Sequence, residues 1–255
     1  MLNNLISIKI KNRIKLIEQA IQNPITSQNK ILKTNIEFAK NTLFGSKNNF
    51  KQIQNYHHFN EMIPLCDYNS IKKYIEISLE FKSDILWPGQ IKWFAKSSGT
   101  THHQSKFIPI TNASLKLCHF KAGKDMLALY LNNHPKSKIL KGKSLMIGGS
   151  TDICKDQYAY VGDLSAIIIK NLPIWVQLKR LPSLKTALLE DWEKKIEHII
   201  KETKSQNITS ISGVPSWTSI IINQLMKTMN VKCLTELWPD IELYMHGGIS
   251  FHNYQ

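Results

Sequence analysis

The sequence predicts an α/β protein in which a helical N-terminal region precedes a sheet with helices packed on it. Up to about residue 85, apolar residues recur at helical spacing; beyond Pro88, short apolar strands alternate with loops and amphipathic helices. The chain has 255 residues, of which 42% are hydrophobic, which is enough to bury a core. We therefore expect a helical region over residues 1–90 and an α/β domain over residues 91–255.

The helices of the first region are predicted from amphipathic segments punctuated by Asn and Thr, near residues 4–22 and 26–41. Asp67 is placed to cap a third helix that extends to about Phe81, because an aspartate at this position accepts hydrogen bonds from the first helical N–H groups.

Strands in the second region are predicted at residues 91–95, 107–110, 144–147, 208–211 and 241–245. Thr111 or Asn112 is expected to cap a helix with the apolar face Leu115, Cys118, Ala122, Met126 and Leu129. Ser183 is expected to open one long helix with the apolar face Leu184, Leu188, Trp192, Ile196 and Ile199. A further helix starts at Pro215.

The formal net charge of +14 allows a basic nucleic-acid-binding protein as an alternative. However, only Arg13 and Arg180 of the 33 basic residues are arginine, the residue preferred for contacts with phosphates and bases. Lys, Ile and Asn, which are abundant here, all have A/T-rich codons, and this accounts for the charge without a nucleic-acid partner.

Several site types find no support in the pattern. The four cysteines are scattered and the nine histidines form no metal signature, so no metal ligands are assigned. No apolar run has the length that spans a bilayer, and no continuous apolar segment resembles a signal peptide. We expect a cytoplasmic protein without a membrane partner.

The strongest local signal is the segment Ser97-Ser98-Gly99-Thr100-Thr101-His102-His103-Gln104-Ser105-Lys106, which directly follows a predicted strand. Phosphate groups are bound by converging N–H and hydroxyl donors, by a glycine that lets the backbone approach, and by a nearby cation. The segment contains all three, although an ordinary Ser/Gly turn is the alternative interpretation. Gly148-Gly149-Ser150-Thr151 is interpreted as a tight turn rather than a second phosphate site.

This segment resembles the phosphate-binding signature of acyl-adenylate-forming enzymes. Six further motifs resemble the bacterial branch of the auxin-responsive acyl acid–amido synthetase family, in the order of that family: Phe38 to Gly45, Ile63-Pro64-Leu65 with Tyr68, Leu86-Trp87-Pro88, Gly162-Asp163-Leu164-Ser165, Gly213-Val214-Pro215-Ser216-Trp217 and His246-Gly247-Gly248-Ile249-Ser250-Phe251. The loop departs from many relatives at His102 and Ser105, where glycine and proline are common.

The resemblance implies that residues 91–255 form part of an adenylate-forming α/β domain, which activates a carboxylic acid with ATP and joins it to an amino acid. It implies Mg²⁺ with the ATP. It implies Ser97, Ser98, Thr100 and Thr101 as phosphate donors, Gly99 as the close-approach residue and Lys106 as the catalytic cation. The remaining implied residues lie along the adenine and acyl group (Gly247, Gly248, Ser250) and in the acyl pocket (Val214, Ser216, Trp217).

Relatives continue well beyond the position that matches Gln255. We therefore expect the domain to be incomplete at its C-terminus, the C-terminal cap domain to be absent and the isolated chain to be inactive. A non-catalytic remnant, or one half of a split gene with a complementary C-terminal fragment as partner, is the second alternative.

Overall fold

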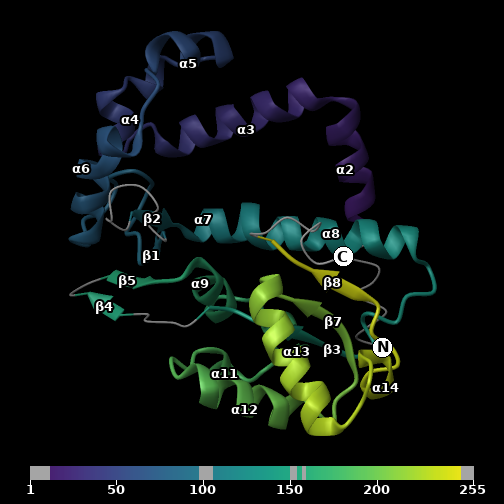
Figure 1. Cartoon of the computed structure of the whole chain (residues 1–255). Helices are drawn as coiled ribbons and strands as arrows, with labels where there is room; N and C mark the ends of the chain where they lie inside the picture. The colour runs from purple at the N-terminus through teal and green to yellow at the C-terminus, as the bar shows by residue number, and fades with distance from the viewer. Residues whose placement is uncertain (1–11, 98–105, 150–153, 157–158, 248–255) are drawn as a thin grey trace. The chain divides into compact units, whose positions relative to one another are not determined.

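The computed structural model describes residues 12–97, 106–149, 154–156 and 159–247 (Figure 1). It divides into two compact units, and neither is a continuous stretch of chain. Unit 1 contains Met1–Lys11, Met126–Asp152 and Ser165–Gln255, and unit 2 contains Asn12–Asp125 and Ile153–Leu164. Each unit has one four-stranded sheet. The predicted α/β class is confirmed. The expected boundary between the helical region and the α/β domain, near residue 90, lies inside unit 2.

Unit 2 begins with helices. Their bounds are α2 (Arg13–Gln22), α3 (Pro24–Ala39), α4 (Leu43–Lys47), the 3₁₀ turn η1 (Phe50–Gln52), α5 (Tyr56–Met62) and α6 (Tyr68–Leu79). Asp67 caps α6 as predicted, because its Oδ1 accepts a hydrogen bond from the Ser70 N–H at 2.8 Å. Bonds from the Ser70 hydroxyl and N–H lower the pKa of the Asp67 carboxyl.

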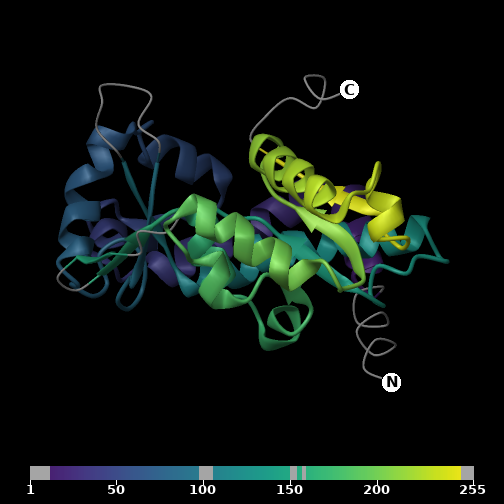
Figure 2. The same ribbon diagram turned by 60° about the horizontal axis from the view of Figure 1, so that its bottom comes forward.

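Sheet A of unit 2 has the order β2-β1-β5-β4. Its strands are β1 (Trp93–Lys96), β2 (Phe107–Ile110), β4 (Cys154–Asp156) and β5 (Ala159–Gly162). β1 pairs with β2 in an antiparallel hairpin and with β5 in parallel. Figure 2 shows the two strands of the hairpin side by side. Phe94 is fully buried in β1 and packs with Ile75 of α6, so the helical region and the sheet share a core.

The helix after the hairpin differs from the prediction. Thr111 caps it, but α7 (Asn112–Ser114) continues as a π-helix, η2 (Leu115–His119), before α8 (Phe120–Asn133). A π-helix turns less per residue than an α-helix, so it rotates all later side chains about the axis. Ala122, Met126 and Leu129 are therefore exposed, like Cys118, and the buried residues of α8 are Ala128 and Leu131.

Sheet B of unit 1 is entirely parallel, with the order β6-β3-β7-β8. Its strands are β3 (Lys143–Met146), β6 (Arg180–Leu181), β7 (Ile208–Ser212) and β8 (Leu243–Met245). From β3 the chain proceeds to β6 on one side, and from β7 it proceeds to β8 on the other. Right-handed connections in opposite directions place helices on both faces of such a sheet.

The helices of unit 1 are α9 (Leu164–Lys170), α10 (Ile174–Gln177), α11 (Leu184–Ala187), α12 (Trp192–Thr203), α13 (Pro215–Met229) and α14 (Leu234–Leu237). The prediction of one long helix from Ser183 is wrong. Ser183 caps α11, and Asp191 caps a separate helix by accepting the Lys194 N–H at 3.1 Å. In Figure 1, α12 and α13 lie side by side, with the rings of Trp192 and Trp217 5.9 Å apart.

The core of unit 1 lies between α12, α13 and sheet B. Its buried members are Leu145, Ile147, Ile199, Ile200, Ile208, Ile211, Ile221, Leu225 and Trp238. None of the described helices combines the length and the hydrophobicity that crossing a bilayer requires.

Candidate functional site

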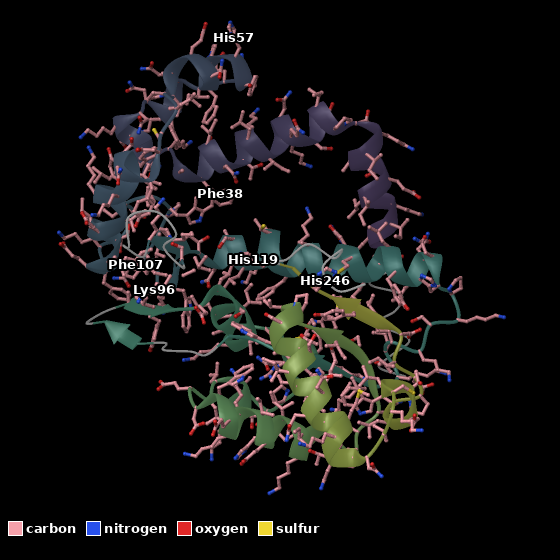
Figure 3. All side chains as sticks on the ribbon, in the orientation of Figure 1. Phe38, His57, Lys96, Phe107, His119 and His246 are labelled. Atoms are coloured by element: carbon pink, nitrogen blue, oxygen red, sulfur yellow. The ribbon has the colours of Figure 1, made fainter. Side chains whose placement is uncertain are left out.

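The base of the predicted phosphate loop is closed by two hydrogen bonds between Ser97 and Lys106. The Ser97 N–H donates to the Lys106 carbonyl at 2.9 Å, and the Lys106 N–H donates to the Ser97 Oγ at 3.1 Å. The preceding pair of the hairpin is Lys96 and Phe107, both labelled in Figure 3. Because the Ser97 hydroxyl accepts one of these bonds, its own proton can be donated elsewhere.

The other predicted loop residues, Ser98, Gly99, Thr100 and Thr101, lie outside the described residues. What the structure establishes is that the segment leaves one strand and returns to the next, with both ends bonded together. The described residues therefore place the two ends of the segment at the end of the β1–β2 hairpin.

The cation of the segment lies beside an aromatic ring from another element. The Lys106 side chain is exposed, and its Nζ is 5.4 Å from the centroid of the Tyr68 ring. Tyr68 is the first residue of α6, directly after the Asp67 cap. The Lys106–Tyr68 contact therefore joins the end of the hairpin to the N-terminal end of a helix from the region that precedes the sheet.

Sheet B has a second arrangement of interest, at the carboxyl ends of β3 and β7. In open parallel sheets, ligands bind between two neighbouring strands whose connections to the next strand lead to opposite sides of the sheet. β3 and β7 are such a pair, because the chain passes from β3 to β6 on one side and from β7 to β8 on the other. Gly148-Gly149 follows β3 and Gly213 follows β7. A Cβ on Gly213 would lie 2.9 Å from the Ile147 Cβ and 2.9 Å from the Thr218 Oγ1, so the close packing requires glycine.

The backbone of Gly148-Gly149 is held by a buried lysine. Lys195 of α12 is 1% exposed, and its ammonium donates to the carbonyls of Gly148 at 3.3 Å and Gly149 at 3.0 Å. The Gly149 N–H donates to the Ser165 Oγ at 3.2 Å. These bonds fix the backbone of Gly148-Gly149, whereas Ser150 and Thr151, the rest of the predicted tight turn, lie outside the described residues.

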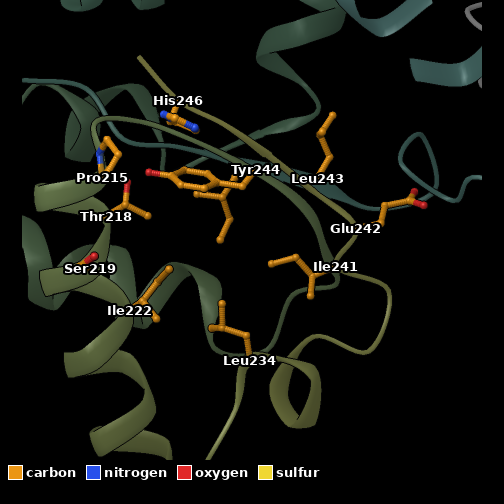
Figure 4. A pocket seen from close by; sticks show the side chains of 11 residues that line it. Pro215, Thr218, Ser219, Ile222, Leu234, Ile241, Glu242, Leu243, Tyr244 and His246 are labelled. Atoms are coloured by element: carbon orange, nitrogen blue, oxygen red, sulfur yellow. The ribbon is translucent and has the colours of Figure 1, made fainter. Parts of the chain in front are cut away.

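The predicted acyl-pocket residues belong to the start of α13. Val214 is its N-cap residue, and Trp217 is 37% exposed and faces Trp192. A cavity of about 480 Å³ lies against the same helix (Figure 4), and its lining includes Pro215, Thr218 and Ser219. Val214, Ser216 and Trp217 are not among the lining residues.

The same cavity extends to the end of β8, where Tyr244 and His246 line it with rings 5.4 Å apart. Gly247 is the last described residue, and a Cβ there would contact nothing within 4 Å. Packing among the described residues therefore does not require glycine at this position. Gly248 and Ser250 lie outside the described residues.

The family model of the GH3 family N-terminal domain matches residues 13–255. The chain belongs to the GH3 family. No curated protein matches it by sequence. Solved structures with a similar fold include the following two. One, named GH3.15 acyl acid amido synthetase, has a TM-score of 0.70 at 17% identity, over 86% of this chain and 39% of that chain. The other, AtGH3.15 acyl acid amido synthetase in complex with 2,4-DB, has a TM-score of 0.57 at 18% identity, over 89% of this chain and 38% of that chain.

The resemblance that the motifs indicated is thus confirmed at the level of family and fold. This GH3 chain spans less than half the length of either solved relative. Among its described residues, no three His, Cys, Asp or Glu side chains lie close enough to hold a metal ion, so none is assigned to Mg²⁺.

Sequence reasoning missed Lys195 in this GH3 chain, although a signal was present. Lys195 falls on the apolar stripe of its helix, between Trp192 and Ile199, and a lysine there must be paired or bonded when the stripe is buried. The contacts of Tyr68 carried no such signal, because they join residues far apart in the sequence.

Proposed function

We propose that this GH3 chain contributes the ATP-phosphate site of an acyl acid–amido synthetase. In the proposed reaction, a carboxylate oxygen attacks the α-phosphorus of ATP, and the bond to pyrophosphate breaks. The amine of an amino acid then attacks the acyl carbon, the bond to AMP breaks, and the amine loses a proton. The proposal rests on family membership and on the two solved relatives, whose names describe this class of enzyme.

The observation that carries the proposal is the closed base of the segment between Ser97 and Lys106. The two backbone ends are bonded to each other, and an exposed ammonium follows the loop. Phosphoryl chemistry of this kind depends on preorganised donors and cations rather than on covalent participation of the protein. A loop anchored in a hairpin supplies that preorganisation at its base.

The proposed roles follow from this arrangement. Ser97, Ser98, Thr100 and Thr101 donate hydrogen bonds to phosphate oxygens, Gly99 allows the backbone to approach, and Lys106 neutralises charge. Gly247, Gly248 and Ser250 are proposed to lie along the adenine and the acyl group. Val214, Ser216 and Trp217 are proposed to form the acyl wall. Mg²⁺ is expected to enter with ATP, and no step is assigned to it here.

The test is ATP–pyrophosphate exchange, measured with this chain in a complete or complemented protein, that is, together with the C-terminal half expected from the family resemblance. A panel of carboxylic acids that includes 2,4-DB is supplied as substrate. Lys106→Ala and Thr100→Ala should each raise the barrier to adenylation by about 2–4 kcal/mol, the scale for losing one preorganised donor. Lys73→Ala is the matched control, because Lys73 has a similar contact with a tyrosine ring, 5.1 Å from the centroid of Tyr74. Unchanged exchange in both site variants would refute the phosphate site.

A further inference from the structure

Tyr68 makes three contacts with the C-terminal end of the loop, at Lys106 and Phe107. Its hydroxyl accepts a hydrogen bond from the Phe107 N–H at 3.0 Å and lies 3.4 Å from the Phe107 carbonyl, to which it can donate. Its ring lies 5.4 Å from the Lys106 ammonium. One side chain thus contacts both the last residue of the loop and the first residue of β2.

These contacts fix the cation in two ways. The hydroxyl holds the backbone of Phe107, and therefore the Cα of the adjacent Lys106. The ring attracts the ammonium through its negative face, an interaction that acts within about 6 Å of the centroid. Lysine otherwise has a long, flexible stem whose ordering opposes binding. A lysine that is positioned before the ligand arrives loses less entropy when it binds.

A simpler explanation is that Tyr68 only protects an edge strand. β2 is the edge of sheet A, and the hydroxyl bonds to Phe107 on that edge. This explanation accounts for the hydroxyl. It does not account for the exposed Lys106 ammonium lying over the ring instead of extending into solvent, and Lys106 is the cation that closes the hydroxyl-rich segment.

We propose that Tyr68 is a positioning residue, which holds the Lys106 ammonium in the orientation that binds the phosphates of ATP. The inference rests on the proposed function, since it assigns a partner to Lys106 in the same site. It extends the site from the hairpin to the start of α6. It also assigns a role to a residue of the region before the sheet, which carries none of the phosphate donors.

The experiment is a double-mutant cycle that measures the KM for ATP in pyrophosphate exchange. Tyr68→Leu should raise this KM by about three- to tenfold, the scale of a cation–π contact together with lost hydrogen bonds. Tyr68→Phe keeps the ring and should raise it by less. In a Lys106→Met background, Tyr68→Leu should raise the KM no further, because the ammonium that it positions is gone.

Two results would overturn the inference. One is an equal rise in KM for Tyr68→Leu with and without Lys106→Met, which indicates that Tyr68 acts through general stability. The other is an equal rise in the KM for ATP in Tyr68→Phe and Tyr68→Leu, which excludes a contribution of the ring to the position of Lys106. Thermal melting of each variant shows whether it folds. If Tyr68→Leu does not fold, the cycle is run with Tyr68→Phe. An equal rise in the KM for ATP for Tyr68→Phe with and without Lys106→Met then refutes the inference.

The cycle also separates this inference from the proposed function. Lys73→Met is the control for Lys106→Met, because Lys73 also lies over a tyrosine ring. If Lys106→Met leaves the KM for ATP as unchanged as Lys73→Met does, the phosphate site itself is refuted. If Lys106→Met raises the KM and Tyr68→Leu adds its full effect on top, the phosphate site stands and only the role of Tyr68 is refuted.

Discussion

Ser97 and Lys106 are bonded to each other twice, once between main-chain groups at 2.9 Å and once between the Lys106 N–H and the Ser97 hydroxyl at 3.1 Å. The second bond depends on a side chain and can therefore be removed alone. Ser97→Ala should weaken ATP binding several-fold while changing the free energy of unfolding by less than about 1 kcal/mol, since water replaces the partner of the exposed N–H. Isothermal titration and urea unfolding measure the two quantities. Ser97→Thr keeps the hydroxyl and is the control.

Gly99 provides a prediction that rests on the sequence, because it lies outside the described residues. If the backbone approaches phosphate there, a Cβ is excluded. Gly99→Val should abolish nucleotide binding and leave the melting temperature within a few degrees, because a loop carries little buried surface. Wild-type nucleotide affinity in this variant would contradict the role given to Gly99.

Gly213 provides a prediction about stability. A Cβ there meets the Ile147 Cβ and the Thr218 Oγ1, each at 2.9 Å, and the Ile147 carbonyl at 3.1 Å. Gly213→Ala should therefore lower the free energy of unfolding by about 1–3 kcal/mol, the usual cost of overpacking. Gly123→Ala in α8 is the matched control. A Cβ at Gly123 contacts nothing within 4 Å, and the change should raise stability by about 0.5–1 kcal/mol, as alanine favours helix.

Glu202 should make stability depend on pH in the acid range. Burial acts to raise the pKa of its carboxyl, but hydrogen bonds from Thr186 and Ser183 outweigh burial, and the pKa is lowered below 4.5. A lowered pKa in the folded state means that the stabilisation is present above the unfolded value and is lost as the pH falls through the folded value. Urea unfolding below pH 4.5 should therefore show stability decreasing with acid.

The variant Glu202→Gln should be less stable at neutral pH and should show a smaller loss of stability in acid than the wild type. Glu193→Gln, an exposed position on the same helix, is the control. An identical acid slope in wild type and Glu202→Gln would show that other groups govern the acid response.

Local signals predicted the elements well where one residue determines the geometry. Asp67, Thr111 and Ser183 each cap a helix, and β2 has the predicted bounds. The errors arose where tertiary packing overrides local preference. Leu115–His119 forms a π-helix, which no periodicity of 3.6 residues anticipates. The predicted long helix from Ser183 is likewise divided into α11 and α12.

The candidate site was predicted only in part. The segment from Ser97 to Lys106 was found from its residue types, because donors, glycine and lysine are adjacent in the chain. The contact of Tyr68 with Lys106 depends on how α6 meets the hairpin, and the bonds of Lys195 depend on how α12 covers β3. Neither follows from spacing, since each joins residues that only the fold brings together.

The interleaved path of the two units has a consequence for synthesis on the ribosome. Sheet A requires Trp93 to pair with Tyr160, and sheet B requires Ser144 to pair with Ser210. The nascent chain can complete unit 2 once Leu164 has emerged. β3 can pair with β6 only after Leu181 and with β7 only after Ile208, so apolar Leu145 stays incompletely covered until then. Exposed strands of this kind promote misassembly. Slow translation between residues 164 and 208 would prolong that vulnerable interval, and chaperone capture should be strongest there.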